Sequence, residues 1–231
     1  MKKVSLIIPT YNESENLPLL IEGVENVIDK NKIDLEYIIV DDNSPDRTWE
    51  VAEKLAEKYP IKVIRRSGKL GLGSAVREGF ASSDREILGV MDADLSHDPI
   101  ILNDLINSLD DNDITIGSRF VDGSVVENWA LNRKIISQVG VFLTRLVTGV
   151  NDPLTGYFLF RREVIENVKL KTIGYKILFE ILIKGNYKKT KEIAFRFKDR
   201  KFSTSKLNYK EYFLFIGQII KYYLYKLFFK K

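Results

Sequence analysis

Residues 86–94 read EILGVMDAD, an apolar run that ends directly in two carboxylates separated by one residue. A short apolar run of this kind predicts a buried strand. The acids Asp92 and Asp94 stand where such a strand would reach the edge of its sheet. The stretch therefore predicts a strand that delivers two acidic side chains to one sheet edge.

Similar apolar runs lie on either side of this stretch, and amphipathic segments separate them. The expected strands are 4–9, 35–40, 61–64, 86–91 and 113–117, and the expected helices are 14–29 (capped by Ser14), one around Trp49–Ala56, 71–81 and 100–109. Strands that alternate with helices predict an α/β fold, with a mostly parallel central sheet covered by helices on both faces. Helices 133–147 and 173–184 and strands 157–160 and 193–197 are expected to pack on the same sheet.

The C-terminal end has a different composition. Residues 1–160 hold 17 basic and 26 acidic residues, whereas residues 161–231 hold 19 basic and 6 acidic ones. Residues 209–229 place aromatic and aliphatic side chains at helical spacing and carry too many charges for a membrane-spanning helix. We expect one large domain over 1–207, followed by a basic aromatic amphipathic helix over 208–231 at a membrane interface. Packing of this helix on the domain is the alternative.

Composition excludes several kinds of chemistry. The chain has no Cys and a single His, His97, so disulfides, Cys-ligated metals, thiol nucleophiles and multi-histidine metal sites are excluded. No secretory signal is recognisable, because Met1 is followed by two lysines and only about six apolar residues. We therefore expect the cytosol as the working compartment. The basic end suggests an anionic partner, which could be a nucleic acid, a phosphorylated ligand or a membrane.

Polar clusters follow four of the expected strands. They are residues 9–13 (PTYNE), Asp41–Asp42, Asp92–Asp94 and Gly117–Arg119. Ligands of doubly wound sheets bind beyond the carboxyl ends of the strands, so the four clusters together predict a binding site. Asp92 and Asp94 can reach one Mg²⁺ or Mn²⁺, which would neutralise the phosphates of a nucleotide; capping of the next helix is the alternative role for these acids.

These stretches resemble family 2 glycosyltransferases with a GT-A fold, and among them the dolichol-phosphate mannose synthases. The resemblance rests on the stretches 4–13 (VSLIIPTYNE), 40–44 (VDDNS), 71–73 (GLG), 92–95 (DADL), 117–119 (GSR), 132–134 (NRK), 152–156 (DPLTG), 174–176 (GYK) and 199–200 (DR). They cover nearly the whole chain. The sequence 71–73 departs from a dinucleotide-binding fingerprint because residue 76 is Val.

The resemblance implies roles for particular residues. Donor-binding positions would be Pro9, Tyr11, Glu13, Val40, Asp42, Asp92, Ala93, Asp94, Arg119, Lys176, Arg200 and Lys206; acceptor-phosphate positions would be Arg119, Arg133, Ser137 and Arg200; metal positions would be Asp92, Asp94 and Ser96. Relatives often have Gln where this chain has Ser96, so Ser96 would ligate through its hydroxyl or through a water. Asp92, Asp94, Arg119 and Arg200 would carry catalysis.

The implied reaction is transfer of mannose from GDP-mannose to dolichyl or polyprenyl phosphate, with Mg²⁺ or Mn²⁺. A phosphate acceptor is mostly ionised at neutral pH, so we expect an inverting single displacement without a protein base. We expect His97 to be structural. The alternatives are transfer of glucose from UDP-glucose, another family 2 transfer to a glycan hydroxyl, or a regulatory nucleotide-binding module without turnover.

The expected partners follow from the lipid acceptor. The protein would lie peripherally at the cytoplasmic face of a membrane, held by its C-terminal helix, by a small membrane-anchoring protein or by both. No motif that reads DNA or RNA is recognisable, so nucleic acid is not expected as a partner.

Overall fold

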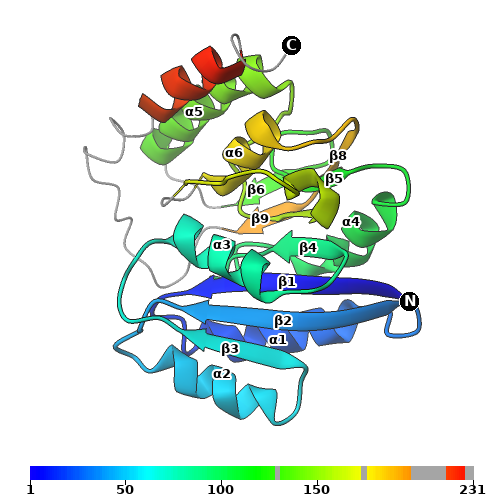
Figure 1. Cartoon of the computed structure of the whole chain (residues 1–231), viewed down its shortest axis with the longest axis vertical. Coiled ribbons are helices and arrows are strands. Elements are labelled where there is room, and N and C mark those ends of the chain that lie inside the picture. Colours follow the sequence, from blue (N-terminus) through cyan, green and yellow to red (C-terminus); the bar gives the residue numbers. More distant parts are fainter. Residues whose placement is uncertain (128–130, 173–175, 199–216, 227–231) are drawn as a thin grey trace.

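A central β-sheet organises the molecule, which is represented by a computed structural model describing residues 1–127, 131–172, 176–198 and 217–226, without side chains for 131–137. Seven of the described strands form this sheet, in the order β3-β2-β1-β4-β7-β5-β8 (Figure 1). Their bounds are β1 (Lys2–Thr10), β2 (Ile33–Asp41), β3 (Ile61–Arg65), β4 (Ile87–Val90), β5 (Ile114–Ser118), β7 (Phe158–Arg161) and β8 (Thr190–Ala194).

The sheet is mostly parallel, as expected. β7 runs antiparallel to both β4 and β5, and the other neighbouring strands pair in parallel. Because β4 and β5 both oppose β7, they point the same way as β1 and β2. The carboxyl ends of these four strands therefore share one edge of the sheet.

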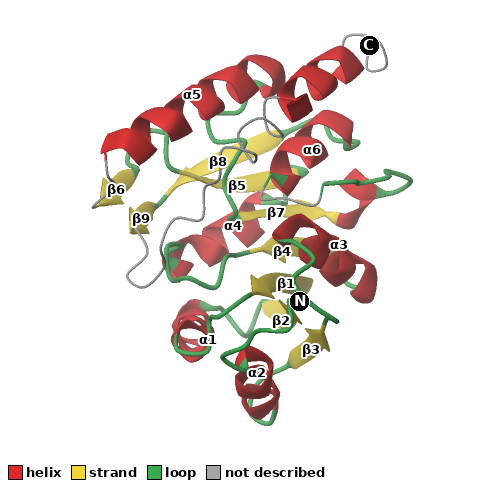
Figure 2. Cartoon of the chain, turned by 90° about the vertical axis from the view of Figure 1, so that its left-hand side faces the viewer, coloured by secondary structure: helices red, strands yellow, loops and turns green. Residues whose placement is uncertain are grey.

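Helices cover both faces because side chains alternate along each buried strand. Val4, Leu6 and Ile8 of β1 join the apolar cluster of one face, whereas Ile7 joins the other. The first face is covered by α1 (Asn16–Val27), α2 (Thr48–Ala56) and α4 (Leu102–Ser108), and the second by α3 (Leu72–Ser82) and α6 (Ile177–Lys184) (Figure 2). A Cβ on Gly79 of α3 would stand 2.5 Å from Ile7 Cγ2, so only glycine permits this close packing.

Several expected boundaries differ from the structure. The N-cap position of the first helix is Glu15 rather than Ser14, and no side-chain hydrogen bond caps the helix; the Ser14 N–H donates to Asp46 Oδ2 (3.1 Å) in the neighbouring loop. The helix expected over 100–109 begins as a 3₁₀ turn, η1 (Pro99–Ile101), and the one expected over 173–184 begins at Ile177 within the described residues. Another 3₁₀ turn, η2 (Arg162–Ile165), follows β7.

The segment expected as strand 193–197 is divided between two sheets. It contributes to β8 and to β9 (Arg196–Lys198), which pairs with the unexpected strand β6 (Val125–Glu127). β6 is only three residues long, and its residues are half-buried or exposed. A strand so short carries too little alternation to be recognised in sequence.

The later part of the chain packs on the same sheet, as expected, because β7 and β8 are strands of the central sheet. Helix α5 (Leu131–Thr148) lies beside residues 217–226, which are also helical (Figures 1 and 2). Tyr222 packs with Val141 and Val147 of α5 and with Phe179 and Ile183 of α6. No helix among the described residues is both long and apolar enough to cross a membrane.

Candidate active site

The four polar clusters converge at one edge, as the sequence predicts. β1 pairs directly with β2 and with β4, so the segments after Thr10, Asp41 and Val90 leave neighbouring strands. Arg119 follows β5, which is separated from β4 only by β7. The carboxyl edge of the sheet therefore brings together the first three clusters, and Arg119 lies two strands beyond β4 at the same edge.

The two adjacent acids after β2 have different environments. The Asp41 side chain is fully buried and accepts hydrogen bonds from Thr10 Oγ1 (2.8 Å), the Ser44 N–H (2.8 Å) and Ser44 Oγ (2.6 Å). These bonds tie the end of β1 to the loop that follows β2. Asp41 therefore has a structural role in this edge.

Asp42 forms a buried ion pair with Arg66. Their side chains are 7% and 5% exposed, and Arg66 Nη1 donates to Asp42 Oδ1. The Gly71 N–H donates to Asp42 Oδ2 (2.9 Å), while Arg66 Nη2 donates to Ser74 Oγ (2.7 Å). Sequence reasoning missed Arg66, whose only signal was its place between a strand and the glycine-rich turn. The pair therefore joins the end of β2, where the nucleotide is expected to bind, to the start of α3.

The expected donor-binding residues of β1 and β2 occupy this edge. Pro9 and Val40 are register partners and both are buried. Half-buried Tyr11 packs its ring under Lys69, whose Nζ lies 3.9 Å from the ring centroid. The Glu13 N–H donates to Thr48 Oγ1 (2.9 Å). Glu13 is thereby anchored to the start of α2.

Asp92 and Asp94 lie in the loop after β4. Asp94 is 8% exposed and its Oδ1 accepts a hydrogen bond from the Ser96 N–H (3.1 Å), while the Asp92 side chain is 22% exposed. Ala93 and Ser96 are buried as well. Asp92 lies against Gly156, where a Cβ would stand 2.5 Å from Asp92 Oδ2. The loop after β4 thus carries one buried carboxylate, Asp94, and one partly exposed carboxylate, Asp92.

His97 is enclosed beneath these acids. It is 3% exposed, its ring stacks on Tyr157 (centroids 5.2 Å apart), and its Nδ1 accepts a hydrogen bond from the Asp92 N–H (3.3 Å). Its Nε2 lies 4.0 Å from Asp92 Oδ2. Burial raises the pKa of the stacked Tyr157 hydroxyl well above its usual range, with a smaller contribution from Asp98. The packing agrees with the expected structural role of His97.

Arg119 forms a bidentate pair with Asp152. Arg119 Nε donates to Asp152 Oδ2 (2.7 Å), Nη2 donates to Oδ1 (2.8 Å), and the Arg119 N–H also donates to Oδ2 (3.0 Å). Burial by itself would lower the pKa of the guanidinium, but the negative charges of Asp152 and, further away, Asp92 raise it overall. Arg119 therefore stays charged beside the acidic loop.

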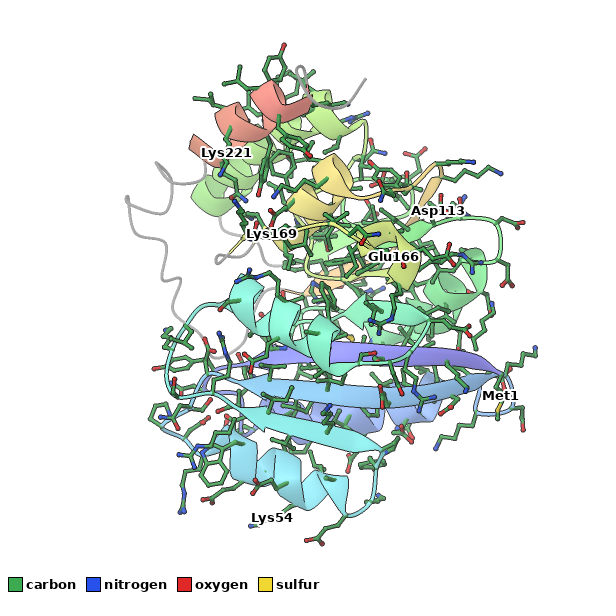
Figure 3. All side chains as sticks on the ribbon, in the orientation of Figure 1. Met1, Lys54, Asp113, Glu166, Lys169 and Lys221 are labelled. Atoms are coloured by element: carbon green, nitrogen blue, oxygen red, sulfur yellow. The ribbon has the colours of Figure 1, made fainter. Side chains whose placement is uncertain are left out.

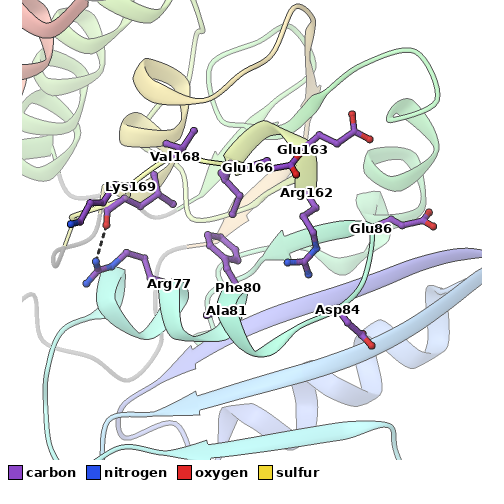
Figure 4. Close-up of a pocket in the computed structure, with 12 residues that line it drawn as sticks. Arg77, Phe80, Ala81, Asp84, Glu86, Arg162, Glu163, Glu166, Val168 and Lys169 are labelled. Atoms are coloured by element: carbon purple, nitrogen blue, oxygen red, sulfur yellow. Dashed lines mark hydrogen bonds between the residues drawn. The ribbon is translucent and has the colours of Figure 1, made fainter.

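A separate cleft lies away from this edge of the sheet. A cavity of about 750 Å³ lies between α3 and η2 (Figure 4), and its lining includes Asp84 and Glu86, which precede β4 at the opposite edge of the sheet. The two arginines that line it donate hydrogen bonds to backbone carbonyls: Arg77 Nη1 to Leu170 (2.8 Å) and Arg162 Nε to Arg85 (2.7 Å). This cavity contains none of the expected site residues.

A family comparison agrees with this arrangement. The model of glycosyl transferase family 2 matches residues 5–169, a span that contains the four strand ends described above. The chain belongs to glycosyl transferase family 2. The expected family is therefore confirmed, as is the mostly parallel α/β sheet, while the C-terminal amphipathic helix stays a prediction.

Curated relatives of this glycosyltransferase are similar over most of the chain. It is 46% identical over 224 residues to a dolichol-phosphate mannosyltransferase of Pyrococcus furiosus, covering 95% of this chain and 63% of the relative. It is 36% identical to a polyprenol monophosphomannose synthase of Mycolicibacterium smegmatis, covering 90% and 82%. The chain thus spans less than two thirds of the length of the Pyrococcus relative.

Solved structures show the same fold at lower identity. A glucosyl-3-phosphoglycerate synthase of Mycobacterium tuberculosis, solved with Mn²⁺, UDP-glucose and phosphoglyceric acid, superposes with a TM-score of 0.66 at 18% identity. The match covers 96% of this chain and 79% of that one. This likeness supports the GT-A architecture of the glycosyltransferase.

Of the remaining expected site residues, only Lys176 has its side chain within the described part of the chain. Lys176 is half-buried and directly precedes α6, and Arg133 and Ser137 lie on α5, where the side chains of 131–137 are outside the description. Arg200 and Lys206 lie outside the described residues, as does the boundary expected between 207 and 208. The roles of these five residues stay predictions.

The acidic loop can be compared with the needs of a divalent cation. No group of three or more His, Cys, Asp or Glu side chains suited to a metal occurs in the described parts of the chain. However, Mg²⁺ is commonly bound by one or two carboxylates together with substrate phosphates and waters. The carboxylate oxygens of Asp92, which is partly exposed, and of Asp94, which is buried two residues further along the same loop, are hard ligands of the kind that pattern requires.

Proposed function

We propose that this glycosyltransferase transfers mannose from GDP-mannose to a dolichyl or polyprenyl phosphate. The identity of 46% to a protein named dolichol-phosphate mannosyltransferase carries this proposal, together with the acidic loop and Arg119 at one sheet edge. A second relative is named for a polyprenol monophosphate product. The names of both relatives thus join mannose to a polyprenol phosphate.

In the proposed reaction, the nucleotide lies along the ends of β1 and β2. Tyr11, Glu13 and Asp42 would contact its base and ribose, while Asp92 and Asp94 would hold a Mg²⁺ or Mn²⁺ against the diphosphate. The bound cation would supply charge neutralisation for the departing diphosphate. Ser96 would support this site through its hydroxyl or a water.

The acceptor is proposed to attack without a protein base. An ionised phosphate oxygen forms the new bond to the anomeric carbon, and the bond from that carbon to GDP breaks with inversion. The acceptor oxygen carries no proton to be removed, because a phosphate monoester has its second pKa near about 6. The burial of His97 under Asp92 is consistent with this proton balance.

Arginines are proposed to aim the two phosphates. A guanidinium donates in a planar fork that suits phosphate oxygens. Arg119 stands at the correct sheet edge, and Arg133, Ser137, Lys176, Arg200 and Lys206 are proposed to complete the donor and acceptor sites. They would compensate the charge that gathers as the acceptor phosphate approaches the diphosphate.

A transfer assay tests the donor and the acceptor. Purified protein is given radiolabelled GDP-mannose or UDP-glucose, a polyprenyl phosphate, and Mg²⁺ or Mn²⁺, and label is counted in the organic phase. We expect label from GDP-mannose only. Label from UDP-glucose alone would contradict GDP-mannose as the donor. Absence of label from both donors would contradict a lipid phosphate as the acceptor.

We also propose that the protein works peripherally at the cytoplasmic face of a membrane. Two neighbouring helices expose apolar side chains: Val139, Phe142, Leu143 and Leu146 of α5, and Ile220, Tyr223 and Leu224 of residues 217–226, with exposures from 39% to 70%. Exposed apolar side chains on adjacent helices suit insertion among lipid headgroups. Lys221 on the same short helix is exposed and would face anionic lipids (Figure 3). A small membrane-anchoring protein would be an additional attachment.

Vesicle flotation tests this attachment. We expect the protein to float with anionic vesicles, and Phe142→Asp with Leu146→Asp to abolish flotation while leaving the folded state intact. Lys54, on α2, is far from the two helices (Figure 3), so Lys54→Asp is a control for a change of charge. Undiminished flotation of the double variant would contradict the proposed surface.

A further inference from the structure

A chain of hydrogen bonds leads from β8 to the guanidinium of Arg119. Glu192 Oε2 accepts from the Asn151 N–H (2.8 Å) and from Asn151 Nδ2 (2.8 Å), and Glu192 Oε1 accepts from the Asp152 N–H (2.9 Å). The carboxylate of Asp152 in turn receives three N–H groups from Arg119. The Glu192 carboxylate thus orients Asp152, and the Asp152 carboxylate in turn holds Arg119.

The register of the sheet explains how Glu192 reaches this loop. Glu192 lies opposite Ile116, two residues before the end of β5, and β5 ends directly before Arg119. The series of hydrogen bonds therefore begins at Glu192 in β8 and ends at Arg119 directly after β5, the parallel neighbour of β8. The loop at 151–152 is held across those strands by side-chain bonds.

The Asp152 pair restricts the guanidinium to one orientation. Two-point contact through Nε and Nη2 fixes both the plane and the direction of the fork, and directs the Nη1 edge away from Asp152. The rings of Phe120 and Phe197 lie 5.4 and 5.3 Å from the guanidinium carbon. The Asp152 side chain is fully buried and that of Arg119 is 11% exposed, so this orientation is held in a setting with little solvent.

We propose that Asp152 and Glu192 are positioning residues for phosphate recognition by Arg119. The inference rests on the proposed function, in which Arg119 contacts the diphosphate and the acceptor phosphate. Asp152 aims the guanidinium, and Glu192 fixes the backbone from which Asp152 extends. Neither carboxylate is assigned a contact with the substrate.

The chain offers a matched control for such a carboxylate. Asp113 Oδ2 accepts from the Lys188 N–H (2.7 Å) and the Lys189 N–H (2.9 Å), a similar clamp between the segments that precede β5 and β8. Asp113 lies at the other edge of the sheet, on the side of Met1 (Figure 3). Asp113→Asn therefore removes a comparable clamp without approaching Arg119.

Steady-state kinetics of the full chain test the inference. In Glu192→Gln, the new amide turns a donor toward N–H groups, so we expect kcat/KM to fall roughly 10- to 100-fold, as for a catalytic group displaced by about 1 Å. Asp113→Asn should lose comparable thermal stability and keep wild-type kcat/KM. An equal loss of kcat/KM in both variants, or none in Glu192→Gln, would overturn the inference.

A double-variant cycle tests whether Asp152 acts through Arg119. We expect Asp152→Asn to lower kcat/KM in the wild type and to have almost no further effect in Arg119→Lys, because lysine lacks the fork that Asp152 orients. Losses that multiply would show that Asp152 acts independently and would contradict its positioning role. If Asp152→Asn does not fold, the same cycle is run with Glu192→Gln.

The outcomes separate this inference from the proposed function. The wild type with GDP-mannose and polyprenyl phosphate is the reference, and absence of its product contradicts the proposed function itself. Calorimetric titration with GDP and Mn²⁺ gives a second readout, in which Glu192→Gln should weaken GDP binding more than Asp113→Asn. If Glu192→Gln leaves both GDP affinity and turnover unchanged, the positioning role is contradicted, while the proposed function is not.

Discussion

Gly156 lies against the carboxylate of Asp92, so closely that a Cβ on Gly156 would stand 2.5 Å from Asp92 Oδ2 and 2.9 Å from Oδ1. This contact joins the loop before β7 to the loop after β4. A methyl group at this place would have to push the Asp92 carboxylate away. The absence of a side chain at residue 156 therefore determines where Asp92 can lie.

Gly156→Ala is expected to impair the metal site rather than the fold. Displacement of Asp92 should raise the Mn²⁺ concentration needed for half-maximal activity and lower kcat by roughly 10- to 100-fold. The measurement is turnover against Mn²⁺ concentration, with Gly23→Ala as a control because a Cβ there would meet only Pro99 Cγ at 3.4 Å. An unchanged Mn²⁺ requirement would contradict the proposed role of this contact.

Asp94→Ala is expected to abolish metal-dependent turnover while unfolding stays cooperative. The carboxylate accepts a hydrogen bond from the Ser96 N–H, and the loss of one such bond costs about 1 kcal/mol. Turnover and urea denaturation are measured on the same preparation. Full activity of this variant would falsify the metal assignment.

Arg66→Met is expected to destabilise the protein by about 3–5 kcal/mol, because it leaves Asp42 buried without its cation. Asp42→Asn combined with Arg66→Met should recover part of this loss, since neither charge then remains. The free energy of unfolding in urea provides the comparison. Additive losses would mean that the two side chains do not stabilise each other.

His97→Phe tests whether the imidazole has a chemical role. A phenyl ring preserves the packing on Tyr157 but removes the acceptor for the Asp92 N–H, so stability should fall by about 1–3 kcal/mol. Activity should stay within about tenfold of wild type, whereas loss of a general base typically costs about 10²- to 10⁴-fold. A loss in that higher range, with metal affinity retained, would argue for proton transfer by His97.

Glu180 gives a prediction on pH. Burial alone would raise its pKa, but Lys184 and the bonds from Thr172 and the Lys171 N–H lower it overall. A carboxyl whose pKa is lower in the folded protein stabilises the fold above its ordinary pKa, and this contribution disappears as pH falls through the folded pKa.

Glu180→Gln should therefore reduce stability at pH 7 by about 1–3 kcal/mol, since its amide cannot accept all these bonds. The difference from wild type should shrink as the solution is made more acidic than the ordinary Glu pKa. Thermal unfolding from pH 3 to pH 8 measures this. A difference that is constant over the whole range would contradict the cause assigned to the shift.

The arrangement of the first four βα units could be predicted from sequence because each strand is a mostly apolar run, interrupted only by single polar residues such as Glu36 and Lys62. The shared carboxyl edge followed from parallel pairing alone. By contrast, β7 entered the sheet antiparallel between β4 and β5, and its four residues carry no sign of direction. The same limit applies to β6 and β9, which pair across about 70 residues of chain.

The residue types of the site were determined by the sequence itself, since the acids and Arg119 directly follow apolar runs and local order puts them at strand ends. Their partners were decided only by tertiary structure. Arg66 reaches Asp42 across 24 residues, Asp152 reaches Arg119 across 33, and Glu192 reaches Asp152 across 40. Such pairs depend on which strands become neighbours, and the packing of the whole sheet chooses that order. Local propensity therefore specified the reactive groups, and long-range packing specified how they are aimed.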